Sequence, residues 1–254
     1  MRISLYLAGM LSGAVLGTAA NAAPVAQARI LQLYSYALKD QAQFELGYRR
    51  HLAWHEAHAD KLVWYAWMVD SGPRKGLFID GTAGASYGGL DARPDPADDG
   101  ADATRNFVPF VLPVNVETWE TWSDVSTATP LEDRSPAAQA DVFFLYVAPG
   151  ASVGFEQALT RLAAKRSPDA PSLTWYRAIR GGAVPAYLLI LSRSNWADLD
   201  RAGGTLNLLL GRAYGVAPAQ VEKALAAVAK VETESWSYLP RLSLIPGKAL
   251  TPQP

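Results

Sequence analysis

Apolar and polar positions in the first part of the chain follow two periods. Alternation, with many aromatic and β-branched side chains, predicts strands near 30–38 and 62–70. Between them, apolar residues recur at helical spacing, which predicts a helix near 41–59. A later apolar stretch, "FVPFVLPVNV" at 107–116, predicts another strand. This part of the chain is therefore expected to fold as strand, helix, strand and, after a long interval, a further strand.

The same order of elements recurs in the second part of the chain. The predicted elements are strands near 142–148, 172–180 and 186–193, helices near 152–166, 205–214 and 218–230, and a last strand, "ETESWSYL", near 232–239. Pro218 stands where a first helical turn accepts proline. The two parts are therefore predicted to share one plan.

Short sequence matches support an internal duplication. "LVWYAW" at 62–67 reappears as "LTWYRA" at 173–178, an offset of 111 residues. The pair Phe44-Glu45 recurs at the same offset as Phe155-Glu156. An offset shared by a strand and a helix indicates a repeated structural unit rather than a chance match.

A strand-helix-strand-strand unit that occurs twice resembles the ferredoxin-like dimeric α/β-barrel superfamily. Its members include EthD-like and NIPSNAP-like proteins, antibiotic-biosynthesis monooxygenases, chlorite dismutases and dye-decolourising peroxidases. The resemblance rests on the architecture and on loose patterns such as Phe44-x3-Tyr48-x2-His51. It implies an α+β fold in which two tandem ferredoxin-like halves form an intramolecular α/β-barrel with antiparallel sheets. It does not by itself imply a shared chemistry.

The two halves are expected at 23–127 and 141–254, joined by a linker at 128–140. Within the first half, a Gly- and Asp-rich stretch near 72–106 is expected to be an insertion, with a solvated, flexible acidic loop. Its acidic segment "DPADDGAD" also suggests calcium, but it lacks the EF-hand spacing. Such an insertion would be long enough to act as a lid over a barrel mouth.

The amino-terminal residues follow the plan of a secretory signal peptide. Arg2 is followed by the short apolar run "LYLAGMLSGAVLG" and by the small-x-small site Ala20-Asn21-Ala22. We therefore expect a signal peptide at 1–22 and a periplasmic or secreted protein. The chain contains no cysteine, which excludes disulfides and thiolate chemistry.

Composition limits the classes of partner. The formal net charge is −1, only 19% of residues are charged, and no run of Lys and Arg stands out. Nucleic acid and anionic membrane surfaces both require clustered positive charge, so neither is expected as a partner. A small molecule is the expected partner, and pairing of two chains as a homodimer is left open.

All three histidines, His51, His55 and His58, fall within eight residues. Helical spacing puts them on the face that carries Phe44 and Tyr48, opposite the charged residues. At the repeat offset, Leu162 and Leu159 replace His51 and Tyr48 in the second helix. An imidazole turned toward the sheet needs hydrogen-bond partners, so this face is expected to meet a polar cavity or specific polar groups.

The histidine spacing limits metal binding. His51 and His58 lie about 10.5 Å apart along a helix axis, too far to share one ion with His55. Two of the histidines can reach one ion more easily than all three, either His51 with His55 or His55 with His58. "HEAH" is one residue short of the zincin motif, which excludes a zincin. The resemblance implies haem with a histidine ligand in the carboxy-terminal half, and that half has no histidine. The cofactor is therefore unknown, with metal and haem both open and neither favoured.

Three functional hypotheses follow. The favoured one is a pocket for a small aromatic molecule, lined by Tyr48, His51, His55, His58, Trp64, Trp67 and Arg177. Strand alternation already sends Trp64 and Trp67 to opposite faces. The second hypothesis is an oxygenase- or isomerase-type enzyme with His51 or His55 as base or metal ligand. The third is a structural module without a ligand. The sequence does not decide whether the protein is an enzyme.

Overall fold

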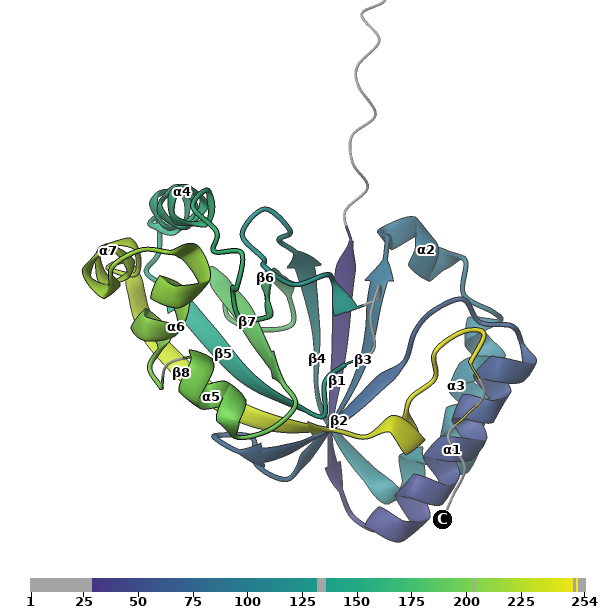
Figure 1. Cartoon of the computed structure of the whole chain (residues 1–254). Helices are drawn as coiled ribbons and strands as arrows, with labels where there is room; N and C mark the ends of the chain where they lie inside the picture. Colours follow the sequence, from purple (N-terminus) through teal and green to yellow (C-terminus); the bar gives the residue numbers. More distant parts are fainter. Residues whose placement is uncertain (1–28, 132–135, 203, 249, 251–254) are drawn as a thin grey trace, which may run out of the picture.

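Eight strands form one closed antiparallel barrel in the computed structural model, which describes residues 29–131, 136–202, 204–248 and 250 (Figure 1). The order of strands around the barrel is β1-β3-β2-β8-β5-β7-β6-β4. The strands are β1 (Ile30–Leu38), β2 (Tyr65–Ser71), β3 (Leu77–Ala85), β4 (Val111–Thr121), β5 (Gln139–Val147), β6 (Leu173–Arg180), β7 (Ala186–Arg193) and β8 (Val228–Tyr238).

Each half of the barrel has the ferredoxin-like strand order, with its first strand between its third and its fourth. In the first half β4 and β3 flank β1, and in the second half β8 and β7 flank β5. The ladders β2·β8 and β4·β6 join the halves and close the barrel. The predicted fold class, two tandem ferredoxin-like halves in an intramolecular barrel, is confirmed.

Helices cover the outside of the barrel, and each half keeps its own set on its own side (Figure 1). Those of the first half are α1 (Gln41–Ala57), α2 (Tyr87–Asp91) and α3 (Pro96–Asn106), with the short 3-10 turn η1 (Val108–Phe110). Those of the second half are α4 (Ser152–Ala163), α5 (Ala197–Ala202), α6 (Leu206–Tyr214) and α7 (Pro218–Ala224). The turn η3 (Pro240–Leu242), which follows β8, lies against α1 on the side of the first half. None of the helices in these described ranges is long and apolar enough to cross a membrane.

Side chains that alternate inward along the strands pack the interior of the barrel. Leu33, Trp67, Trp119 and Trp236 are buried there in one apolar cluster with side chains from both halves. Small residues fit where this packing is tightest, since a Cβ at Gly81 would press against Leu33 and Trp67. The barrel interior is therefore a packed core.

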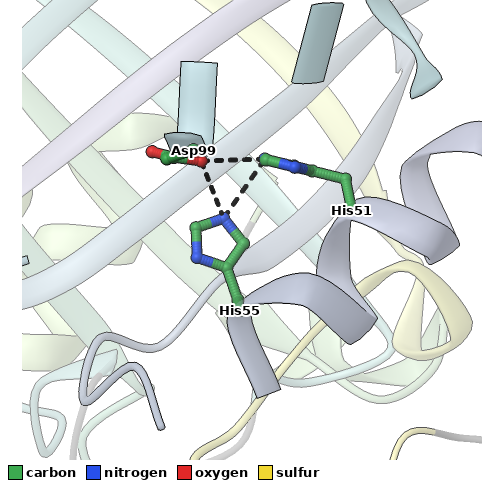
Figure 2. Close-up of side chains that lie close together, drawn as sticks. All are labelled: His51, His55 and Asp99. Atoms are coloured by element: carbon green, nitrogen blue, oxygen red, sulfur yellow. Dashed lines mark hydrogen bonds and ion pairs between the residues drawn. The ribbon is translucent and has the colours of Figure 1, made fainter. Parts of the chain in front are cut away.

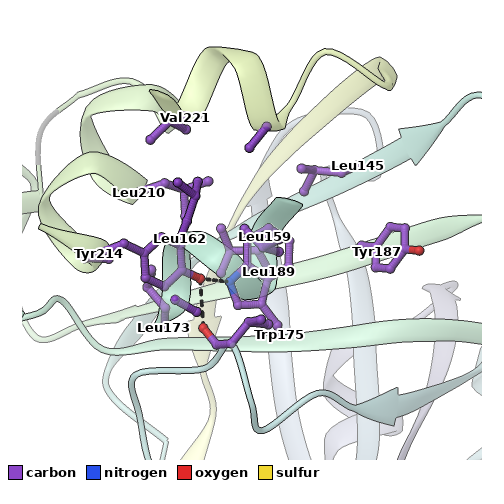
Figure 3. Packing of buried hydrophobic residues seen from close by; sticks show 14 of the residues in the cluster. Leu145, Leu159, Leu162, Leu173, Trp175, Tyr187, Leu189, Leu210, Tyr214 and Val221 are labelled. Carbon is purple, nitrogen blue, oxygen red and sulfur yellow. Dashed lines mark hydrogen bonds between the residues drawn. The ribbon is translucent and has the colours of Figure 1, made fainter. Parts of the chain in front are cut away.

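The outer layer of the second half is a second apolar core (Figure 3). Phe155 and Leu159 of α4 pack on the outward face of the sheet with Trp175 and Tyr214, and all four are at most 1% exposed. The polar atoms of this layer are paired, because the Trp175 indole donates to the Tyr214 hydroxyl at 2.9 Å. This hydroxyl donates in turn to the carbonyl of Val125 at 2.8 Å.

The segment 72–106, expected to be an insertion with a flexible acidic loop, instead forms β3, α2 and α3. The helix α3 has clear start signals, since Asp95 accepts from the amide of Asp98 at 3.1 Å and Pro96 occupies the first turn. The acidic side chains Asp98 and Asp99 then stand in the positive first turn of the helix. The predicted loop is therefore the second large helix of the first half.

Two further boundaries differ from those predicted. The helix expected at 218–230 ends at Ala224, and β8 already begins at Val228. The strand expected at 107–116 begins at Val111, because the proline-containing turn η1 precedes it. The predicted signal peptide at 1–22 and residues 132–135 of the predicted linker lie outside the described residues.

Close packing of α3 against α1 depends on one glycine. Gly47 is buried in α1, and a Cβ at this position would overlap the main-chain carbonyl of Asn106 at the end of α3. Backbone cannot move aside as a flexible side chain can. Glycine is therefore required where the two helices meet.

We predict that Gly47→Ala lowers the free energy of unfolding by about 1–3 kcal/mol, because the methyl group forces α3 away from α1. The matched control is Gly154→Ala in α4, where a Cβ meets open space. This control should gain about 0.5–1 kcal/mol from helix propensity. Urea unfolding of both variants measures the difference, and equal effects at the two sites would contradict the packing argument.

Candidate metal centre

The helix α1 presents His51 and His55 one turn apart on its buried face. Asp40 caps the helix start by accepting from the Gln43 amide at 3.1 Å, and the helix continues to Ala57. His51 is 7% exposed and His55 is 3% exposed. Their spacing of four residues brings the ring centroids to 4.6 Å.

Asp99 of α3 completes a triangle of three donor atoms with the two histidines (Figure 2). The Nε2 atoms of His51 and His55 lie 3.2 Å apart. Asp99 Oδ1 lies 3.3 Å from the first and 3.6 Å from the second. The point equidistant from the three atoms is about 2.0 Å from each, which is the length of a bond from zinc to nitrogen or oxygen.

The other ring nitrogen of each histidine meets a second carboxylate. His51 Nδ1 lies 2.9 Å from Asp102 Oδ2, and His55 Nδ1 lies 2.8 Å from Asp60 Oδ2. The His51 contact is a hydrogen bond in which Nδ1 is the donor, since a carboxylate only accepts, and the His55 contact is an ion-pair contact. A proton on Nδ1 of each ring leaves its Nε2 lone pair available to a metal ion beside Asp99.

With both protons on Nδ1, three electron-rich atoms converge on one point, where a cation would meet all three. With a proton on one Nε2, the two rings instead form the hydrogen bond of 3.2 Å. The pattern of two imidazoles and one carboxylate, with a carboxylate behind each imidazole, is a frequent arrangement at metal sites. Three protein ligands leave open coordination positions, as catalytic metal sites do. The arrangement is suited to a divalent transition-metal ion.

Hydrogen bonds keep the outer carboxylates ionised. Burial alone would raise the pKa of Asp60, but hydrogen bonds from His55, the Leu62 amide and the Trp64 indole lower it below its ordinary value. The pKa of Asp102 is also lowered against the effect of burial, by His51 and Asn106. Burial lowers the pKa of His51. Carboxylates therefore supply most of the charge around the two imidazoles.

The sequence-predicted residues do not all gather at this centre. His58 is exposed at the end of α1, where its Nδ1 lies 2.8 Å from the Trp54 carbonyl and its ring stacks on Trp54 at 4.0 Å. Trp64 does belong to the centre, because its ring lies 4.8 Å from that of His55 and its indole donates to Asp60 at 2.9 Å. Tyr48 is buried beside them, with its ring 6.4 Å from that of His51.

Trp67 and Arg177 lie elsewhere. Trp67 points into the barrel core, where its ring is 5.7 Å from that of Trp236. Arg177 belongs to the second half, where its Nε lies 3.1 Å from Glu156 Oε1 and its guanidinium stacks over Trp122 at 4.0 Å. The expected single pocket in the barrel is therefore corrected: the histidines lie outside the barrel, between α1 and α3, and these two residues are separate from them.

Sequence reasoning missed Asp60, Asp99 and Asp102. The helix-start pattern of Asp95 and Pro96 was the available signal for α3. Helical spacing would then have placed Asp99 and Asp102 on one face of α3, three residues apart. With the segment read as a loop, both aspartates entered only the calcium hypothesis and were not connected with the histidines.

The residues present do not fit the haem group that the resemblance implied. In the second half the layer under the helices is filled by Trp175, Tyr214 and the leucines around them, and the chain has no histidine after His58. In the first half the two Nε2 atoms are turned to each other and to Asp99, within 3.6 Å, which leaves no room for a macrocycle. The donor set suits a bare ion instead.

Comparisons with known proteins identify the fold. No family model matches the chain, and no curated protein matches its sequence. Among solved structures, a putative monooxygenase from Lactobacillus acidophilus matches with a TM-score of 0.53 and 11% identity over 84% of this chain and 94% of that one. A putative monooxygenase from Fusobacterium nucleatum matches with a TM-score of 0.54 and 8% identity over 85% and 94%.

A mutant chlorite dismutase from Candidatus Nitrospira defluvii also matches, with a TM-score of 0.51 and 9% identity over 84% of this chain and 92% of that one. The chain shares their fold. At these identities the likeness concerns the architecture, so the chemistry must be argued from the residues of this chain.

We predict that Asp60→Ala lowers the free energy of unfolding by about 2–5 kcal/mol, measured with a chelator present. The Asp60 side chain is 2% exposed, and its loss leaves the Leu62 amide and the Trp64 indole without their acceptor. The control is Asp91→Ala, an exposed position at the end of α2, with an expected change within about 0.5 kcal/mol.

The effect of Asp60 also depends on pH. Because its pKa is lowered in the fold, its contribution is complete above its ordinary pKa of 3.8 and fades as the pH falls through the lowered value. A difference between wild type and variant that grows on acidification would contradict this assignment.

Proposed function

We propose that this protein is an exported, metal-dependent enzyme of the oxygenase or isomerase type that acts on a small organic molecule. His51 Nε2, His55 Nε2 and Asp99 Oδ1 hold one divalent first-row transition-metal ion. Substrate binds at the coordination positions that these three ligands leave open. Asp102 and Asp60 hold the imidazoles in the tautomer that metal binding requires.

One observation carries the proposal: two imidazole nitrogens and one carboxylate oxygen from two helices lie 3.2–3.6 Å from one another, and a second carboxylate stands behind each imidazole. The names of two fold neighbours, both putative monooxygenases, are consistent with chemistry on organic molecules. Within the superfamily, EthD-like and NIPSNAP-like proteins remain the proposed relatives, on the repeat and the Phe44-x3-Tyr48-x2-His51 pattern.

We predict that the protein, purified without a polyhistidine tag, holds about one zinc, iron, manganese or cobalt ion per chain after exposure to each metal and gel filtration. Elemental analysis measures the occupancy. Asp99→Asn and His55→Ala should abolish it. Asp102→Ala should weaken metal affinity by about 10- to 100-fold, because it releases the His51 ring.

Matched controls are present in the same elements. Asp98→Asn alters the neighbouring carboxylate, which accepts from the Trp54 indole at 2.9 Å, and an amide oxygen can still accept there. His58→Ala removes a histidine that faces away from the centre. Both variants should keep full occupancy. Wild-type protein that takes up no ion would refute the proposal, and so would equal losses in the controls.

A further inference from the structure

The outer layer of the second half holds a cavity between the sheet and the helices α5 and α6, which lie over this part of the barrel in Figure 1. Its volume is about 250 Å³, close to the lower limit of about 300 Å³ for ligand pockets, so it suits a small molecule. Leu191 belongs to the apolar outer layer, so the floor of the cavity faces the helices. This floor includes one row of side chains that stand opposite one another on four strands: Leu191 of β7, Asp141 of β5, Ser235 of β8 and Ser71 of β2.

Apolar side chains form the walls of this cavity. Phe143 of β5 lines it from the sheet, and Leu199 of α5 and Leu209 of α6 line it from the helices. Trp196 also lines the cavity and is 70% exposed. The guanidinium of Arg193 lies 4.6 Å from the centre of the Trp196 ring and holds that ring at the cavity. Two aromatic rings in the walls indicate a ligand that is itself an aromatic ring.

Asp141 supplies an oriented hydrogen-bond acceptor in the floor. Its Oδ2 accepts from Arg193 Nε at 2.9 Å, and its Oδ1 accepts from the Ser235 hydroxyl at 2.9 Å. A carboxylate has about four lone-pair positions, so these two contacts fix Asp141 and leave it able to accept from a ligand. The other carboxylate of the lining, Glu234, has both oxygens bound by the Arg74 guanidinium at 2.8 and 2.9 Å.

The first half closes the corresponding part of its own outer layer. At the repeat offset of 111, Asp141 corresponds to Ile30 of β1, which is 0% exposed. One row further along the floor, Thr233 of β8 is exposed, whereas Thr118, at the matching place on β4, is 3% exposed. The fold can therefore cover this face over an apolar residue, and the second half instead leaves it open around a carboxylate.

We propose that this cavity binds a small neutral aromatic molecule with one N–H or O–H donor, such as an indole or a phenol. The ring of the ligand contacts Phe143 and Trp196, and its donor bonds to Asp141. Arg193 already balances the charge of Asp141, so a neutral donor is favoured over a second cation, and the two carboxylates of the lining disfavour an anion. The cavity shares no residue with the metal centre and lies in the other half, so this second site goes beyond the proposed function.

Calorimetric titration of the purified protein with two matched probes tests this proposal. Indole carries a ring N–H, and in 1-methylindole a methyl group replaces that hydrogen. Indole should bind with a Kd of about 10 µM to 1 mM, as expected for so small a ligand. 1-Methylindole should bind at least about tenfold more weakly, because it cannot donate to the carboxylate. In Asp141→Asn this preference should fall to about threefold or less, because a neutral amide is a weaker acceptor. A preference that stays unchanged in the variant would show a steric effect of the methyl group and would contradict the role of Asp141.

A variant that fills the cavity leaves Asp141 and Arg193 unchanged. Gly204 lines the cavity, and a Cβ at this position meets open space, so Gly204→Phe should fold normally and abolish indole binding. The matched control is Gly154→Phe in α4, where a Cβ also meets open space, and it should keep the wild-type affinity. Trp196→Ala removes an exposed ring and should weaken indole binding about threefold to tenfold through the lost stacking contact.

The outcome at this cavity is independent of the metal centre. Indole affinity should be the same with a chelator present and in Asp99→Asn, so a chain that takes up no metal ion can still bind indole. The proposed site is overturned if wild-type protein does not bind indole, if it binds the two probes equally, or if Gly204→Phe binds indole as the wild type does.

Discussion

Closure of the eight-stranded barrel is the constraint on which the rest of the structure depends. The ladders β2·β8 and β4·β6 leave no free sheet edge, and they bring the inward side chains of both halves into one core. An interior filled by residues such as Trp119 and Trp236 offers no space for chemistry. Functional groups are therefore displaced to the outer layers, between the sheet and its helices.

The two outer layers solve the same packing problem with different chemistry. In the second half, Leu162 and Leu159 of α4 complete an apolar layer. In the first half, the equivalent positions hold His51 and Tyr48. Around the histidines stand two carboxylates of α3, Asp99 and Asp102, and Asp60 from the connection between α1 and β2. Removing charged groups from water costs free energy, and a layer of apolar side chains has no such cost. The second half builds the same layer from apolar side chains. The polar layer of the first half is therefore better explained by a ligand than by stability.

The sequence predicts the fold well because each element carries its own periodicity and the repeat confirms it. The helical spacing within α1 also identifies His51, His55 and Tyr48 as residues that face the sheet. The sequence fails where a site is assembled from two helices. Asp99 belongs to a segment whose composition suggests a loop, and its role appears only when Gly47 allows α3 to lie against α1. Alternation separates Trp64 from Trp67, but it does not show which face lies under the histidines.

A proton is the physical rival of a metal ion at the centre. One proton on His51 Nε2 would satisfy the contact with Asp99 at 3.3 Å. The same proton can instead be donated to His55 Nε2 at 3.2 Å, but one N–H cannot point fully at both acceptors. A second proton would satisfy both histidines but place two positive imidazoles with ring centroids 4.6 Å apart. A cation at the centre of the triangle would meet all three atoms at once, and the near-equal sides agree with the proposed metal site.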